Sequence, residues 1–322
     1  MKKINRETMA SYWLFAGVCI LLLSLKLTTI LLSIFFSLLA LHMLTFRSYK
    51  KTSITLFFIL VSTIFLGFAY FINQAVITIP EIAENALPDI TQFAQKYGIK
   101  IPFSDIQSFK NTIVTLFKTE LSSLANFAKI ASKEFLYLII GIVIAIGMFI
   151  TPTIENEKEE NIASNNLYST LCLRLIERGN NFFSSFKQVM GAQILISLIN
   201  TFFTGIFIYI ENLPYFELLL TFTFLCGLLP IIGNVISNII IFFVASTISL
   251  LLAIHSLIFL IVLHNAEYFL NSKIIGRAIK NPTWLTLFSL VVGERLIGIP
   301  GLILAPVFLR YLKKEGHDIE WH

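Results

Sequence analysis

The sequence predicts an all-α integral membrane protein with about eight transmembrane helices and two interrupted, re-entrant hairpins in its C-terminal half. Composition points to this class, because 56% of the 322 residues are hydrophobic and only 13% are charged, against about 25% charged in soluble domains. Several apolar segments also reach the roughly 20 residues that a helix needs to cross ~30 Å of hydrocarbon. Finally, two long apolar stretches contain Pro and Gly near their middle, where these residues break a helix.

Residues 1–79 are predicted to hold the N-terminal transmembrane helices. The apolar run 10–25 follows basic residues as in a signal peptide, but Lys26 and a second apolar run replace the expected cleavage site. We therefore interpret it as an uncleaved signal anchor. Short loops rich in Lys and Arg mark the cytoplasmic side, which predicts a cytoplasmic N-terminus. The basic residues concerned are Lys2, Lys3, Arg6, Arg47, Lys50 and Lys51.

The middle of the chain is predicted to leave the membrane twice. Residues 80–134 form an extracytoplasmic helical insert, since helix 54–79 starts at the cytoplasmic side, and residues 135–152 return as a transmembrane helix. Residues 153–188 are expected to be a cytoplasmic linker and an interfacial helix with an apolar stripe. A soluble partner helix is the alternative. Residues 315–322 are predicted to be a cytoplasmic tail.

Residues 189–314 are predicted to be the transport core, beginning with a helix that carries one polar stripe. Gln193, Ser197, Asn200, Thr201 and Thr204 recur at helical spacing on segment 189–210. Lipid cannot satisfy such groups, so they must face other helices or a water-filled cavity. Both interpretations, helix packing and a lined pathway, stay open at this point.

The stretch LLPIIGN, residues 228–234, interrupts an apolar run that is too long for one span. Pro230 lacks an N–H group and Gly233 weakens a helix, so the chain is predicted to break here. Asn234 and Asn238 follow at i, i+4 and could cap or line the broken end.

Segment 252–272 carries ionisable residues on one face. His264, Glu267 and Asn271 lie at i, i+3 and i+7, and charges in spanning helices usually face a bundle interior or a pathway. An interfacial anchor is the alternative, because basic residues follow closely.

Segment 283–312 lies between two basic, cytoplasmic regions and is too short for two full spans. We therefore expect a re-entrant hairpin, with two short tilted helices that turn near Gly298–Gly301 as the alternative. Its expected turn residues are Gly298, Pro300, Gly301 and Pro306, and the charged pair Glu294–Arg295 precedes them. Paired interrupted segments indicate a transporter binding site.

These residues resemble the autoinducer-2 exporter family of permeases. LLPIIGN is similar to the family's P-x-x-G turn, and residues 264–314 resemble its C-terminal signature, whereas Glu294–Arg295 and Pro300 depart from the usual pattern. The resemblance implies a multi-pass permease that exports small molecules or exchanges ions, with homo-oligomeric assembly. Family members have been linked to export of a quorum-sensing furanone and to sodium/proton antiport. The matching positions are Glu267, Gly276, Pro282, Gly293, Gly298, Gly301, Ala305 and Pro306.

The functional prediction is a permease of the cell (inner) membrane, with both termini cytoplasmic, that works by ion-coupled alternating access. A passive channel or a sodium/proton antiporter is the alternative, and no catalytic motif suggests an enzyme. We expect no cofactor or metal, H⁺ or Na⁺ as a possible coupling ion, and no nucleic-acid partner. Expected partners are the bilayer, a small molecule or ion, and further copies of the chain, a pentamer among the options. Glu267 or Glu294 could carry the proton, because burial favours a neutral carboxyl. The predicted pathway residues are Asn200, Pro230, Gly233, Asn234, Asn238, His264, Glu267, Asn271, Glu294 and Arg295.

Overall fold

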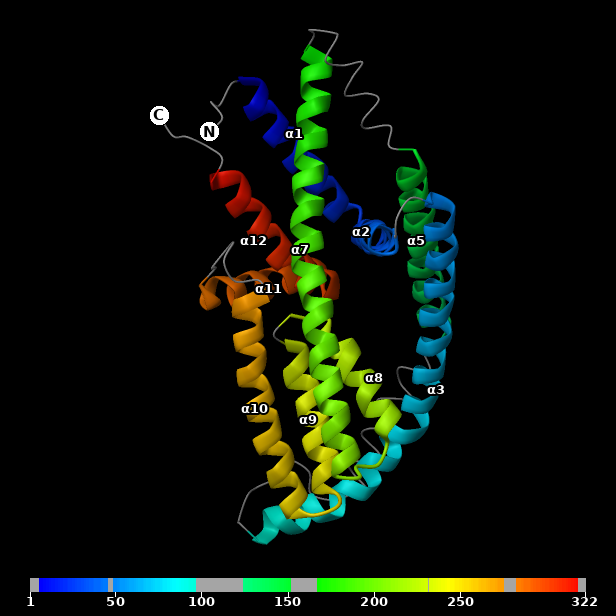
Figure 1. Ribbon diagram of the computed structural model, residues 1–322, viewed down its shortest axis with the longest axis vertical. Coiled ribbons are helices and arrows are strands. Elements are labelled where there is room, and N and C mark those ends of the chain that lie inside the picture. The colour runs from blue at the N-terminus through cyan, green and yellow to red at the C-terminus, as the bar shows by residue number, and fades with distance from the viewer. Residues whose placement is uncertain are drawn as a thin grey trace. The chain divides into compact units, whose positions relative to one another are not determined.

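The computed structural model describes residues 6–45, 49–96, 124–151, 167–230, 232–274 and 282–317, and for some helical residues it describes the backbone alone. All regular elements in these ranges are helices (Figure 1), so the all-α class is confirmed. They are α1 (Arg6–Ser24), α2 (Thr28–Met43), α3 (Lys50–Lys96), α5 (Leu124–Ile150), α7 (Leu167–Ile210), α8 (Phe216–Gly227), α9 (Ile232–Ser246), α10 (Leu250–Ile274), α11 (Thr283–Ile297) and α12 (Ile299–His317).

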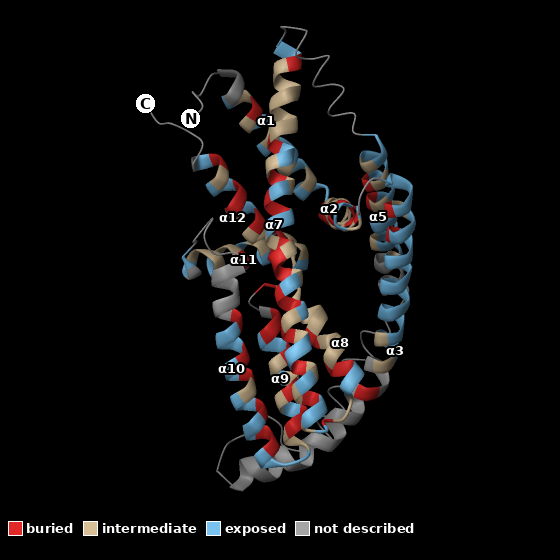
Figure 2. Ribbon diagram, viewed as in Figure 1, coloured by how far each residue is buried: buried red, intermediate tan, exposed pale blue. Residues whose placement is uncertain are grey.

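Four described helical segments are long and apolar enough to cross a membrane: Lys50–Gln74, Ser132–Ile150, Leu167–Ile210 and Leu250–Glu267. The bent pair α1–α2 would make a fifth, α8 and α9 are shorter apolar helices, and the number eight stays a prediction. Most described residues of α3 and α5 are exposed (Figure 2), including many Leu, Ile and Phe side chains. Apolar surface of this extent fits contact with lipid, as expected of a multi-pass membrane protein.

The chain divides into two compact units. The first unit comprises Met1–Leu60, Lys133–Ala192 and Ile275–His322, and the second comprises Val61–Ser132 and Gln193–Ile274. Helices α3, α5 and α7 each contribute one part to the first unit and the other part to the second. The two units therefore share backbone through continuous helices.

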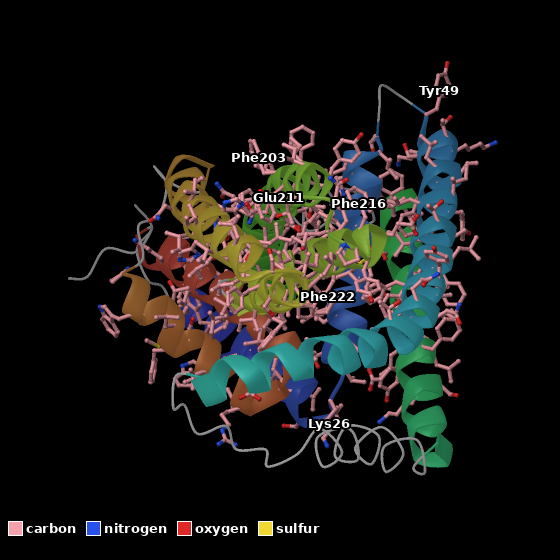
Figure 3. The ribbon with its side chains drawn as sticks, turned by 90° about the horizontal axis from the view of Figure 1, so that it is seen from below. Lys26, Tyr49, Phe203, Glu211, Phe216 and Phe222 are labelled. Carbon is pink, nitrogen blue, oxygen red and sulfur yellow. The ribbon has the colours of Figure 1, made fainter. Side chains whose placement is uncertain are left out.

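In the first unit, α1 and α2 meet at an angle of 113°. Lys26, at the corner (Figure 3), has a left-handed φ of 56°. Its N–H donates to the Leu23 carbonyl at 3.1 Å, and the Leu27 N–H donates to the Leu22 carbonyl at 3.0 Å. This is the Schellman arrangement that ends a helix, usually with Gly in the left-handed position. Lys occupies it here, so the sequence carried no Gly or Pro signal for the corner.

Aromatic rings form much of the first unit's core. The ring centroid of Phe35, on α2, lies 5.1 Å from that of Phe186 and 5.7 Å from that of Phe182, both on α7. Phe182 in turn lies 5.4 Å from Tyr311 of α12. The apolar stripe expected on the interfacial helix thus packs against other helices of this unit.

In the second unit, α7, α8, α9 and α10 pack around a buried aliphatic cluster. The Phe207 ring of α7 stacks on the Phe259 ring of α10, with 4.2 Å between centroids. Glu211, just after α7 (Figure 3), lies 3.2 Å from His255 Nδ1. The cluster contains Ile208, Leu213, Leu219, Ile241, Val244, Ala245, Leu252 and Leu260.

Several helices extend beyond the segments expected from hydropathy. α7 runs without a break through residue 188, where an interfacial helix was expected to give way to a transmembrane one, and has 44 residues. α3 continues past residue 79 to Lys96, and α12 continues past residue 314 to His317. Hydropathy marks the residues that are compatible with lipid, whereas helical hydrogen bonding also continues through polar sequence. The ends of the apolar segments and the ends of the helices therefore differ. Residues 97–123, 152–166 and 318–322 of the predicted insert, linker and tail lie outside the described residues.

The segment 283–312 forms two helices, α11 and α12, that pack on each other and turn at Gly298. Gly298 has a φ of 67°, and its N–H donates to the Glu294 carbonyl at 2.7 Å. A Cβ atom built on Gly293 would lie 2.6 Å from the Gly301 carbonyl oxygen, so the helices approach through backbone. Pro300 lies in the first turn of α12, where its missing N–H removes no helical bond. Pro306 lies inside α12, which continues past it.

Candidate functional site

Polar side chains of the second unit meet in one small site between α7, α8, α9 and α10. Five of the predicted pathway residues, from three separate helices, lie here: Asn200, Asn234, Asn238, His264 and Glu267. No water-sized space separates the described side chains of the site, and the site is closed in this sense. An ion or a molecule could therefore enter only after the helices or side chains move apart. The full lining is Asn200, Thr223, Asn234, Ser237, Asn238, Leu263, His264 and Glu267.

The break between α8 and α9 brings α9 to this site. α8 ends at Gly227, the buried Pro230 lies in the short link, and α9 starts at Ile232. A Cβ atom on Gly233 would overlap the Cys226 carbonyl oxygen, so only glycine permits this close approach. The link reverses the chain, and Asn234 and Asn238 follow it by one and two turns.

Two residues of the α7 polar stripe hold the end of α8. Gln193 Nε2 donates to the Gly227 carbonyl, and Ser197 Oγ donates to the Phe224 carbonyl, each at 2.7 Å. Both carbonyls belong to the last turn of α8, where carbonyl groups have no N–H donor within the helix. Helix packing is therefore the correct interpretation for this part of the stripe.

The next part of the stripe has unsatisfied polar atoms. Asn200 is 2% exposed and Asn234 is 5% exposed, yet Asn200 Oδ1 and Asn234 Nδ2 have no hydrogen-bond partner among the described residues. The same holds for Oγ1 of Thr201 and Thr204. An unpaired buried polar group costs about 1–3 kcal/mol, so such groups need a functional or structural explanation. Asn200 and Asn234 line the same site. Asn200 Oδ1 is therefore an acceptor, and Asn234 Nδ2 a donor, for a bound ion or molecule.

Glu267 is the buried carboxyl of the site, at 6% exposed. His264 Nδ1 lies 3.9 Å from Glu267 Oε2, and the His264 side chain is 60% exposed. This distance exceeds a hydrogen bond, but a protonated imidazole would attract the carboxylate across it. The carboxyl of Glu267 thus lies in the buried site, while its neighbour His264 reaches the surroundings.

The other predicted pathway residues lie elsewhere or are only partly described. The backbone of Asn271 lies in α10, but its side chain is outside the described residues. Glu294 and Arg295 lie on α11 of the first unit, are exposed, and make no side-chain hydrogen bond or ion pair with the described residues.

The predicted pathway residues left out two polar residues that line the site, Thr223 and Ser237. Their hydroxyls donate to carbonyls of their own helices, at 2.8 Å and 3.1 Å. Ser237 lies one helical turn after Asn234, which is a signal that could have placed it on the same face.

A second buried polar group joins α1, α7 and α12 in the first unit. Arg178 forms an ion pair with Glu315, and both are buried, at 4% and 6% exposed. The Arg178 guanidinium also lies 3.7 Å from the Tyr12 ring centroid, and Tyr12 donates to Glu315 at 2.8 Å. Arg178 lies in the segment predicted to hold an interfacial helix, and Glu315 lies in the predicted tail. Their pairing depends on tertiary contacts that no local pattern reveals.

A family model described as "AI-2E family transporter" matches residues 9–317. The chain belongs to the AI-2E transporter family. It is also 33% identical over 134 residues to "Putative transport protein YdbI" of Bacillus subtilis (strain 168). That alignment covers 41% of this chain and 38% of the relative, so the chain spans well under half of it. The family membership that the sequence motifs predicted is therefore confirmed.

Proposed function

We propose that the protein is a permease of the cell membrane that exports a small molecule or exchanges ions by ion-coupled alternating access. The observation that supports this best is the closed polar site of the second unit. Polar groups from four helices meet there, including a buried carboxyl and two amide atoms that have no hydrogen-bond partner in the described part of the chain. Burying such groups is unfavourable unless they are used, and sites beside interrupted helices are typical of secondary transporters.

Glu267 is the proposed proton or sodium carrier. An ionised carboxyl can only accept hydrogen bonds, whereas a protonated one also donates. Asn234 Nδ2 can serve the ionised form and Asn200 Oδ1 the protonated form, because both line the same site. The carboxylate, amide and hydroxyl oxygens of the site also suit a hard cation. His264 then links the charge on Glu267 to the surroundings.

The closed state of the site favours alternating access over an open channel. Release of a bound ion requires the site to open, and α9 carries Asn234 directly after the turn between α8 and α9. Movement of this hairpin would therefore change the access and the polar contacts together. We propose that both termini are cytoplasmic, as the distribution of basic loops predicts, and that the exposed apolar faces of α3 and α5 contact lipid or further copies of the chain.

A proteoliposome assay tests the coupling role of Glu267. The full chain is reconstituted around a trapped pH-sensitive dye, and a sodium gradient is imposed. We expect Glu267→Gln to slow the resulting change in internal pH about tenfold or more, a barrier change of ~1.4 kcal/mol. Glu217→Gln is the matched control, since Glu217 is an exposed carboxyl of the same unit outside the site. Unchanged pH-dependent flux in Glu267→Gln would rule out the coupling role.

The same vesicles distinguish an exporter from a channel. Uphill accumulation of the furanone signal under an imposed pH gradient requires coupling, and a channel allows equilibration alone. An uncoupled flux that no gradient can drive uphill would overturn alternating access.

A further inference from the structure

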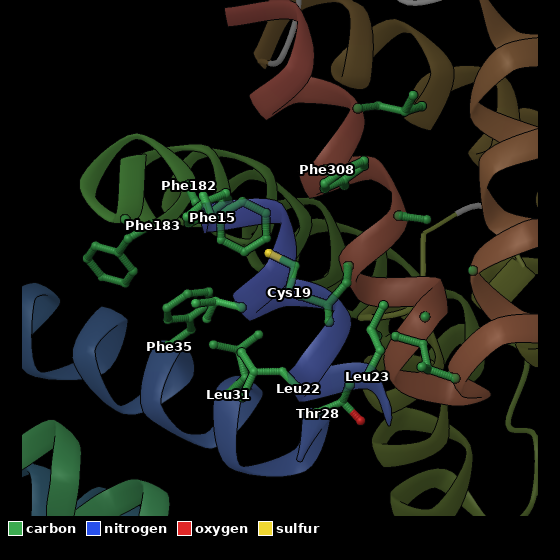
Figure 4. Close-up of a pocket in the computed structure, with 18 of the residues that line it drawn as sticks. Phe15, Cys19, Leu22, Leu23, Thr28, Leu31, Phe35, Phe182, Phe183 and Phe308 are labelled. Atoms are coloured by element: carbon green, nitrogen blue, oxygen red, sulfur yellow. The ribbon is translucent and has the colours of Figure 1, made fainter. Parts of the chain in front are cut away.

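The first unit contains a large cavity that is separate from the polar site. Its volume is about 1070 Å³, at the upper end of the range for ligand pockets. It is partly open and mostly apolar, with side chains from α1, α2, α7, α11 and α12 (Figure 4). Phe15, Cys19, Leu22, Phe35 and Phe182 are among the side chains that surround it in the figure. An apolar space this large is unfavourable if it stays void, because protein interiors are close-packed.

One face of α2 forms a long wall of the cavity. Leu31, Phe35, Leu38, His42 and Thr45 line it and follow each other at three- or four-residue spacing. From Leu31 to His42 the helix rises about 16 Å at 1.5 Å per residue. This length is about half of a ~30 Å hydrocarbon core, which is the depth of one leaflet.

The basic residues that line the cavity gather at one end of this wall, whereas Thr28 is the polar residue at its other end. His42 lies in the last turn of α2, Thr45 follows two residues after its end, and Lys50, at the start of α3, also lines the cavity. Lys50 Nζ donates to the Ile150 carbonyl at 3.2 Å, and no carboxylate of the described residues lies within ion-pair distance of it. Its positive charge is therefore available to an anion at the end of an apolar chamber.

We propose that this cavity binds one anionic phospholipid, with an acyl chain along α2 and its phosphate at Lys50. Apolar walls would accept the chain without leaving polar groups unpaired, whereas a polar solute would lose its hydration there. Basic pockets between transmembrane helices on the cytoplasmic side are suited to anionic headgroups. The basic residues around position 50 are those that predict this side.

Native mass spectrometry of the full chain in detergent tests the proposal. The protein is titrated with phosphatidylglycerol and with phosphatidylcholine of the same acyl chains. We expect tighter binding of phosphatidylglycerol, and we expect Lys50→Gln to weaken it about fivefold, toward the level of phosphatidylcholine. Lys51→Gln is the matched control, because Lys51 is an exposed neighbour that does not line the cavity.

A second variant tests the chamber itself. Leu31→Trp should fill part of it and reduce binding of both lipids, whereas Val143→Trp, on an exposed part of α5, should not. Equal binding of the two lipids that Lys50→Gln leaves unchanged would overturn the proposal. The proposal would also fail if neither lipid bound and Leu31→Trp dissociated an oligomer. That result would show that the cavity is a contact surface between copies of the chain. Neither outcome depends on transport activity.

Discussion

The two helical hairpins, α8–α9 and α11–α12, are interrupted by similar residues but have different surroundings. In the first, the turn lies against buried polar side chains, and Gln193 and Ser197 hold its carbonyls. In the second, the turn at Gly298 is made by backbone alone, and the helices pack through Gly293 and Gly301. Pro and Gly thus indicate where the chain reverses, but not whether the reversal serves a polar site.

α7 fixes both hairpins through polar side chains, at different places on each. Its second-unit part contacts the last turn of α8, close to the hairpin turn. Its first-unit part contacts the far end of α12, where Arg178 pairs with Glu315 and Gln188 accepts from Arg310. The second hairpin is therefore held at its end, while its turn makes no such side-chain hydrogen bond to α7 among the residues that the structure describes.

Glu315→Ala should have the largest effect, because it removes the tie at the end of the second hairpin. It would leave the buried charge of Arg178 without its carboxylate partner, which costs about 3–5 kcal/mol. We expect a marked drop in the melting temperature of the purified protein in detergent. Arg174→Ala is the control, since Arg174 and Glu177 form a partly exposed pair at 3.3 Å that should contribute about 0–1 kcal/mol. Equal shifts in the two variants would show that the end of α12 is not an anchor.

Gly233→Ala and Gly301→Ala should each destabilise their own hairpin. In both cases a Cβ atom would overlap a backbone carbonyl of the partner helix, Cys226 or Gly293. Forced overpacking of this kind costs about 1–3 kcal/mol, measurable as reduced thermal stability. Gly147→Ala is the control, because nothing lies within 4 Å of the added atom and alanine favours a helix. If Gly233→Ala were harmless, the close approach of α8 and α9 would not be needed.

The sequence predicted both reversals and the main residues of the polar site. Asn200, Asn234 and Glu267 were identifiable because polar groups in apolar helices stand out, and their spacing placed them on inward faces. What the sequence could not show was which groups are paired. The roles of Gln193 and Ser197 depend on the position of the α8 end, a tertiary contact with no local pattern.

Two other features were hidden for different physical reasons. The corner at Lys26 uses a left-handed residue that is not glycine, so no turn signal marked it. The ion pair between Arg178 and Glu315 joins residues 137 positions apart, so no local sequence pattern connects them. A local charge pattern predicts which side of a single helix is exposed, but packing against other helices can bury that side.

Glu294 and Arg295 provide the smallest expected effect and the sharpest distinction between the hairpins. Both were predicted as pathway residues, but they are exposed and unpaired among the described residues, unlike the buried Glu267. Glu294→Gln and Arg295→Gln should therefore change stability by no more than about 0.5 kcal/mol and leave dye-reported pH coupling intact. Parallel melting and proteoliposome measurements would check this against Glu267→Gln. Loss of coupling in Glu294→Gln would instead place the second hairpin in the pathway, and the polar site of the second unit would then be one of two.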